Sequence, residues 1–238
     1  MNISKVNEAL YNWWLELPGR EQYYTNPYLI MPSTEYLNAK KKALILGKET
    51  NGWAQKEIEE EKTNGETAIW PTVKLERFYD EQINKKRIGA NPFWNFCWEL
   101  ESALKGKFNN IELCYANVAV LGLPYGQRGY DPKLAEPLSI FLKDYIEALQ
   151  PDVIICLTGF GTKTNTERPY LKLLNRVFGE YDETKDVIIG NQEMKYPLRK
   201  LYFPNVKIPI LGTAHPERKS KAWKEDTIRS FGKFCLTL

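Results

Sequence analysis

Short apolar runs alternate along this chain with longer stretches of helical periodicity. The clearest run is Val153–Leu157, which follows the turn signal Pro151-Asp152 and is typical of a strand buried on both faces. Before it, residues 134–149 carry apolar side chains at helical spacing. The same criteria predict further strands at 43–46, 111–121, 187–189, 199–203 and 208–212. They predict further helices at 6–17, 73–83, 91–104, 169–178 and 223–234.

Strands that alternate with helices in this way predict a mainly parallel sheet covered by helices on both faces, a three-layer α/β/α sandwich. No linker, repeat or low-complexity segment interrupts the pattern, so residues 1–238 are expected to form one domain. In such a sheet the chemistry gathers in the loops at the carboxyl ends of the strands. Candidate functional residues are therefore expected in these loops.

The composition is that of an ordinary soluble protein rich in aromatic residues. Of the 238 residues 43% are hydrophobic and 26% charged, and the seven Trp and fourteen Tyr either fill a core or stack on nucleobases. The net charge of +3 requires no anionic partner, but residues 191–238 alone carry ten basic and four acidic side chains. This basic end fits either a phosphate-facing surface or an ordinary solvated face.

The four cysteines, Cys97, Cys114, Cys156 and Cys235, show no metal-ligand spacing such as C-x-x-C. Three of them lie in apolar runs, so we expect buried free thiols in a reducing compartment. The N-terminus has no signal-peptide pattern, and no apolar stretch is long enough to span a bilayer. The protein is expected to be cytoplasmic and to have no membrane partner.

Polar residues stand out at three predicted strand ends. Gly47 lets backbone approach a ligand, and Glu49 offers a carboxylate two residues later. Asn117 interrupts the apolar run 111–121; it either ties down neighbouring backbone or reads a ligand edge with both a donor and an acceptor, as a pyrimidine has. His215, the only histidine, follows the last strand, which favours a functional role over core packing.

In their order and placement these motifs resemble those of the uracil-DNA glycosylase superfamily. Gly47-Lys48-Glu49-Thr50 occupies the place of the family's Gly-x-Asp-Pro or Gly-x-Asn-Pro motif, and Asn117 that of its base-reading Asn. His215-Pro216 and Ser220 match the family's His-Pro-Ser-Pro-Leu-Ser at the same spacing. The resemblance extends from Leu44 to Arg229 and implies a central, mainly parallel four-stranded sheet.

A fourth segment, Asn91-Pro92-Phe93-Trp94-Asn95-Phe96, resembles the Asn-Arg-Phe-Trp helix start of the mismatch-specific and single-strand-selective branches. It implies that Phe93 or Trp94 stacks on an extruded base. The scattered cysteines do not fit the clustered ligands of the iron–sulfur branches.

The chain departs from the family pattern in the first motif. Thr50 replaces a Pro, and Glu49 is a longer acid than Asp. Asn51 stands where uracil-strict members carry a Tyr that blocks the pyrimidine 5-methyl group. The base accepted could therefore be uracil, a thymine-like base or a larger 5-modified pyrimidine, in base-excision repair or in defence against viruses with modified DNA.

The resemblance implies a DNA glycosylase that flips out a base and hydrolyses its N-glycosidic bond, leaving an abasic site. Glu49 would stabilise the oxocarbenium-like sugar and activate water, unless Asn51 positions that water, and His215 would donate to the base oxygen. Asn117 would select the base edge, with Gly47 and Asn51 beside the base. No metal or organic cofactor is required.

The basic residues after His215 are the implied DNA contacts of a monomeric protein. Arg218 or Lys219 lies where relatives place the wedge that fills the vacated stack, and Ser220 and Lys221 would face phosphates. Two alternatives stay open. One is a catalytically inactive DNA-binding module of the same fold, which the altered first motif supports. The other is a small-molecule hydrolase on a flavodoxin-like sheet.

Overall fold

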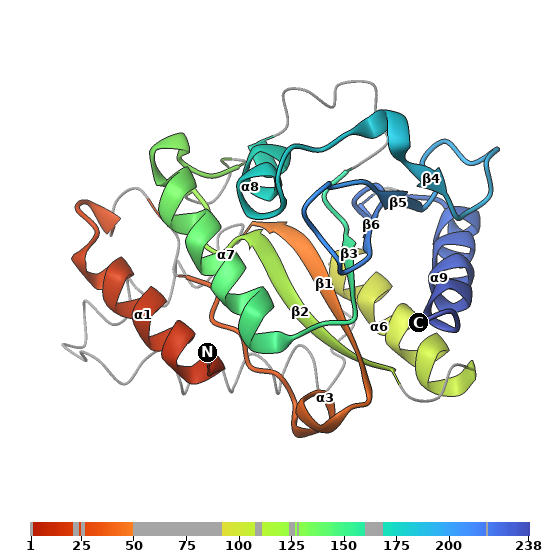
Figure 1. Ribbon diagram of the computed structural model, residues 1–238, viewed down its shortest axis with the longest axis horizontal. Coiled ribbons are helices and arrows are strands. Elements are labelled where there is room, and N and C mark those ends of the chain that lie inside the picture. Colours follow the sequence, from red (N-terminus) through yellow and green to blue (C-terminus); the bar gives the residue numbers. More distant parts are fainter. Residues whose placement is uncertain are drawn as a thin grey trace.

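A computed structural model describes residues 2–20, 24, 27–49, 92–107, 111–123, 127, 129–159, 169–217 and 219–238 (Figure 1). Its helices are α1 (Ile3–Glu16), α3 (Thr34–Asn38), α6 (Pro92–Lys107), α7 (Ala135–Leu149), α8 (Pro169–Phe178) and α9 (Lys221–Cys235), with 3-10 turns at Pro132–Leu134 and Glu183–Lys185. Its strands are β1 (Lys41–Glu49), β2 (Ile111–Ala119), β3 (Val153–Cys156), β4 (Val187–Ile188), β5 (Arg199–Leu201) and β6 (Ile210–Gly212).

The described strands form one mixed sheet in the order β2-β1-β3-β6-β5-β4. Strands β2, β1, β3 and β6 run parallel to one another. Strand β5 pairs antiparallel with β6, and β4 pairs antiparallel with β5 at the edge of the sheet. The prediction of a four-stranded sheet is therefore wrong in strand number, since the described sheet has six strands and includes β4 and β5. That pair joins the main sheet because β5 bonds to β6 from Arg199↔Gly212 to Leu201↔Ile210.

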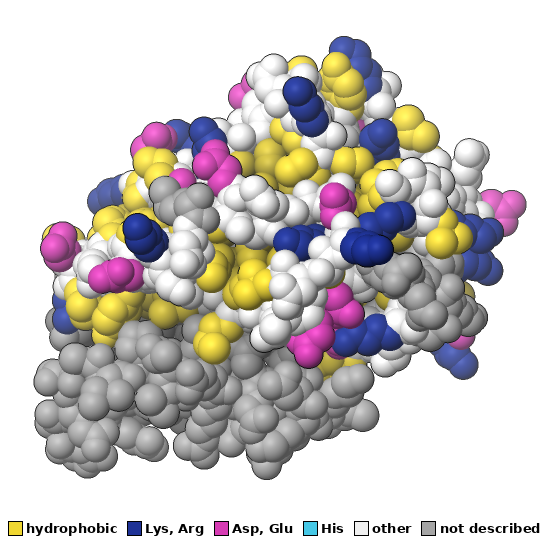
Figure 2. Space-filling model, turned by 60° about the horizontal axis from the view of Figure 1, so that its bottom comes forward, with side chains coloured by type: hydrophobic (Ala, Val, Ile, Leu, Met, Phe, Trp, Pro, Cys, Tyr) yellow, Lys and Arg dark blue, Asp and Glu magenta, His cyan; other side chains and the backbone are white. Residues whose placement is uncertain are grey.

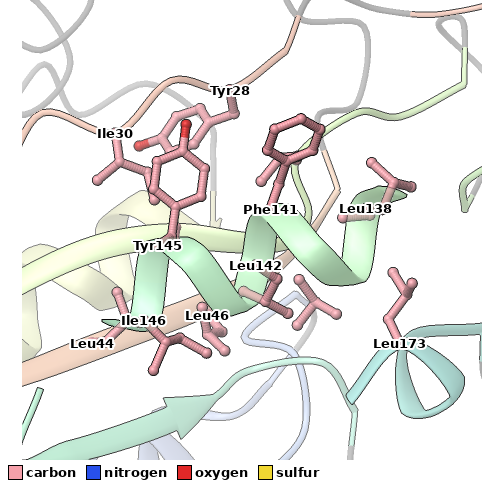
Figure 3. Packing of buried hydrophobic residues seen from close by; sticks show 14 of the residues in the cluster. Tyr28, Ile30, Leu44, Leu46, Leu138, Phe141, Leu142, Tyr145, Ile146 and Leu173 are labelled. Carbon is pink, nitrogen blue, oxygen red and sulfur yellow. The ribbon is translucent and has the colours of Figure 1, made fainter. Parts of the chain in front are cut away.

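Helices cover both faces of the sheet, which confirms the predicted α/β class. Successive side chains of β1 point to opposite faces, as in any strand. Leu44 and Leu46 belong to a core cluster shared with α1, α7 and α8, whereas Ala43 and Ile45 belong to a second cluster shared with α6 and α9. Figure 3 shows the first cluster, in which Leu44 and Leu46 of β1 lie close to Leu142 and Ile146 of α7.

Several element boundaries differ from the predictions. The helix at 169–178 is found as predicted, and the predicted helix at 73–83 lies outside the described residues. Helix α3 was missed because it has only five residues and buries only Tyr36. Strand β1 continues past its apolar part, so that Glu49 is its last residue and pairs with Ala119.

The four cysteines are buried free thiols, as predicted. Burial raises the pKa of Cys114 and of Cys235 to about 12. Among the described residues, no group of three or more His, Cys, Asp or Glu side chains could hold a metal ion. Within the same part of the chain, every helix is too short or too polar to cross a membrane.

Candidate functional site

The carboxyl ends of β1 and β2 bring a glycine, an amide and an aromatic ring into contact. Gly47 and Asn117 are partners in the parallel register of the two strands. A Cβ atom on residue 47 would lie 2.5 Å from Asn117 Oδ1 and 3.1 Å from Phe93 Cζ. A side chain at residue 47 would require Asn117 or Phe93 to move, and glycine lets the Asn117 amide and the Phe93 ring approach the same stretch of backbone.

The Phe93 ring, on the first turn of α6, lies parallel to the His215 imidazole. Their centroids are 5.8 Å apart and their planes differ by 14°. The two rings are therefore close to parallel, and they come from segments far apart in the sequence, the first turn of α6 and the turn after β6.

A tight turn after β6 fixes the orientation of the His215 ring. The Lys219 N–H donates to the Pro216 carbonyl at 3.2 Å, and the Glu217 N–H donates to His215 Nδ1 at 3.3 Å. A ring nitrogen that accepts a hydrogen bond carries no proton. The hydrogen bond to Nδ1 therefore favours the neutral tautomer whose proton is on Nε2.

Two donors engage the carboxylate of Glu49, one at each oxygen. The Tyr170 hydroxyl donates to Oε2, and the Gly129 N–H lies 3.5 Å from Oε1. Tyr170 belongs to the first turn of α8, and Gly129 has a φ of +97°, which glycine adopts without strain. Glu49 is itself partly buried at the end of β1. Its carboxylate is thus held between two segments that follow it in the chain.

Of the two aromatic residues proposed to stack on a base, the structure brings Phe93 next to His215. Trp94 packs edge-on against Phe93, with centroids 5.2 Å apart, and against Tyr115 at 5.5 Å. Trp94 therefore supports the Phe93 ring.

The residues that follow His215 have varied surroundings. The Ser220 hydroxyl accepts from the Trp223 N–H at 3.2 Å and caps the N-terminus of α9. The Lys221 ammonium lies 3.7 Å from the Glu225 carboxylate, and its side chain is 90% exposed. Arg218 and Asn51 lie outside the described residues.

Lys219 has an aromatic neighbour that the sequence did not indicate. Its ammonium lies 4.8 Å from the centroid of the Tyr196 ring, and the Lys195 ammonium lies 5.3 Å from the same ring. The Tyr196 carbonyl accepts from Trp223 Nε1 and from the Thr213 hydroxyl. Tyr196 therefore packs beside the turn that carries His215, and the Lys195 and Lys219 ammonium groups both lie near its ring.

The sequence also gave no indication that Tyr170 and Gly129 would meet Glu49. Tyr170 lies in a predicted helix at an ordinary apolar position, and Gly129 lies in a loop between β2 and α7. Both residues reach Glu49 only because α8 and that loop pack at the carboxyl end of β1.

Comparisons with protein-family models and with curated proteins found no match for the chain. The resemblance to the uracil-DNA glycosylase superfamily therefore depends on the short motifs quoted above.

Proposed function

We propose that the protein is a monomeric DNA glycosylase of the uracil-DNA glycosylase type, which hydrolyses the N-glycosidic bond of a flipped-out pyrimidine. The observation that carries the proposal is the parallel arrangement of Phe93 and His215 beside Asn117. A base stacked on Phe93 would present its edge to a ring nitrogen donor and to an amide. These groups are suited to bind a planar heterocycle with polar edges.

His215 would act on the leaving base. As the glycosidic bond breaks, negative charge develops on the base oxygen, and the His215 ring, held by the Glu217 N–H at Nδ1, would donate to it from Nε2. A donor fixed in place before the reaction stabilises such charge without reorganising.

Glu49 would act on the sugar side. Its carboxylate is fixed by Tyr170 and Gly129, and each carboxylate oxygen can accept more than one hydrogen bond. It can therefore hold a water molecule as well and stabilise the positive charge that develops on the sugar.

Asn117 would read the base. Its amide supplies both a donor and an acceptor next to the backbone of Gly47. A uracil-like edge offers the complementary acceptor and donor, which makes a pyrimidine the proposed substrate.

The test is an excision screen with purified protein. Oligonucleotides carry uracil, mismatched thymine or a 5-modified cytosine, and alkali cleavage after incubation reveals abasic sites. We expect cleavage at one of these bases by the wild-type protein and a loss on the order of 10²–10⁴-fold in Glu49→Gln. Salt-dependent DNA binding without any abasic site would indicate the inactive binding module. Absence of DNA binding would favour the small-molecule hydrolase.

A further inference from the structure

We infer that Tyr170 is a positioning residue that fixes the carboxylate of Glu49 for water activation. The inference rests on the role proposed for Glu49. It starts from the hydrogen bond between the Tyr170 hydroxyl and Glu49 Oε2.

Tyr170 is well placed to act as a rigid donor. Its side chain is 7% exposed and lies on the first turn of α8, a helix that buries Leu173, Leu174 and Phe178 in the core. The Tyr130 hydroxyl donates to the carbonyl of Pro169 at 2.9 Å, and the two tyrosine rings are 6.5 Å apart. Burial raises the pKa of Tyr130, with Arg176 opposing, so this hydroxyl stays protonated and continues to donate.

The length of the Glu49 side chain explains why its carboxylate needs a hydrogen bond to fix its orientation. A glutamate has one more rotatable bond than the aspartate that the family motif carries, and a freely rotating carboxylate spends less time in the productive geometry. Tyr170 fixes one oxygen and Gly129 approaches the other. The phenol thus compensates for the extra methylene group and holds the carboxylate in one orientation.

The first experiment compares Tyr170→Phe with a matched control. Tyr181→Phe removes a different tyrosine–carboxylate hydrogen bond, from Tyr181 to Asp186, and leaves Glu49 untouched. For Tyr170→Phe we expect the single-turnover excision rate to fall about 10- to 100-fold, the range for losing one hydrogen bond to a charged group, with DNA affinity unchanged. Tyr181→Phe should cut at the wild-type rate. Equal rates for both variants would overturn the inference.

A double-mutant cycle separates positioning from general support of the fold. In a Glu49→Gln background the catalytic carboxylate is absent, so Tyr170→Phe should lower the residual rate no further. A structural role would instead multiply the two losses, and that outcome would overturn the inference.

An activity-free measurement keeps this inference distinct from the proposed function. The hydroxyl proton of Tyr170 should give a downfield resonance in the NMR spectrum of the free protein, absent in Tyr170→Phe and shifted upfield in Glu49→Gln. If no base is excised but this resonance behaves as expected, the proposed function fails while the hydrogen bond stands. A resonance unaffected by Glu49→Gln would overturn the positioning role.

Discussion

At the scale of single residues, Gly47 leaves no free space for a side chain beside Asn117 and Phe93. An added Cβ atom would overlap Asn117 Oδ1 at 2.5 Å and press on the Phe93 ring at 3.1 Å. Residues of the site therefore have to move if residue 47 gains a side chain.

We expect Gly47→Ala to lower the single-turnover rate about 100-fold, because displacing a bound group by about 1 Å has that effect. The free energy of unfolding should fall by only about 1–3 kcal/mol, as for other overpacked sites. Urea unfolding and single-turnover kinetics on the same preparation check both values. Wild-type excision by Gly47→Ala would mean that the base does not stack on Phe93 with its edge at Asn117.

Asn117→Asp should change which base is cut. The substitution exchanges an amide donor for an acceptor, so preference should move from a uracil-like edge towards a cytosine-like edge. The measurement is the ratio of excision rates on paired uracil and cytosine oligonucleotides. The same ratio in both proteins would show that Asn117 does not contact the base edge.

The sequence indicated part of this site and missed the rest for a physical reason. Gly47, Asn117 and His215 lie at strand ends, and parallel strands place their carboxyl ends together, so their proximity follows from the order of the elements. Tyr170 meets Glu49 through the docking of a helix on the sheet. Periodicity places that residue on a buried face but does not say which polar group it meets.

At the scale of elements, backbone pairing and capping extend the helices and strands beyond their apolar parts. The apolar pattern predicts a strand at 43–46, yet β1 runs on to Glu49 because β2 offers backbone partners as far as Ala119. Helix α9 begins at Lys221, two residues before the predicted start, because Ser220 caps it.

Ser220→Ala should therefore lower the free energy of unfolding by about 1 kcal/mol, the usual value of a lost N-cap. Ser33→Ala is the matched control, because it also removes a serine N-cap. The Ser33 hydroxyl accepts from the Tyr36 N–H at 3.1 Å at the start of α3. Chemical denaturation of both variants gives the comparison. A serine hydroxyl is neutral, so the salt dependence of DNA binding should stay that of the wild-type protein in both.

At the scale of the whole molecule, the basic C-terminal segment carries less uncompensated charge than its composition indicates. On the face shown in Figure 2, Lys and Arg side chains are interspersed with Asp and Glu. Two cations of the segment pair with acids from outside it, Lys224 with Glu99 and Arg199 with Glu183, within 4.0 Å. Lys221 and Arg229 pair with Glu225 and Asp226, acids that the composition of the segment already counts. Phosphate contacts are therefore expected from a few residues near His215.

Lys221→Ala tests this expectation. Each phosphate contact releases counterions, so the slope of log affinity against log salt should become shallower by about 0.9 and binding should weaken alike on all sequences. Lys143→Ala is the matched control, because Lys143 is also exposed and forms an i,i+4 pair, with Glu147, on α7. Fluorescence anisotropy over a salt series measures both slopes. Equal slopes for the two variants would place Lys221 away from the DNA.

The parallel strands of the sheet were more predictable from the sequence than the two antiparallel strands at its edge. Unbroken apolar runs identify strands buried on both faces, which is why β1, β2, β3 and β6 and their helices follow from the sequence. Strands β4 and β5 have only two and three residues, and period-two patterns in such short segments do not say which strand they join.

The position of β1 between β2 and β3 has a consequence for the order of events during folding. Leu44 pairs with Cys114 and with Ile154, partners that lie 70 and 110 residues further along the chain. Pairings between such distant segments form late and slow the acquisition of structure. The ring that faces Phe93 comes later still, from the turn after β6. A chain emerging from the ribosome thus lacks the complete candidate site until residue 215 has been synthesised. If the proposed function holds, chains that end before His215 should excise no base.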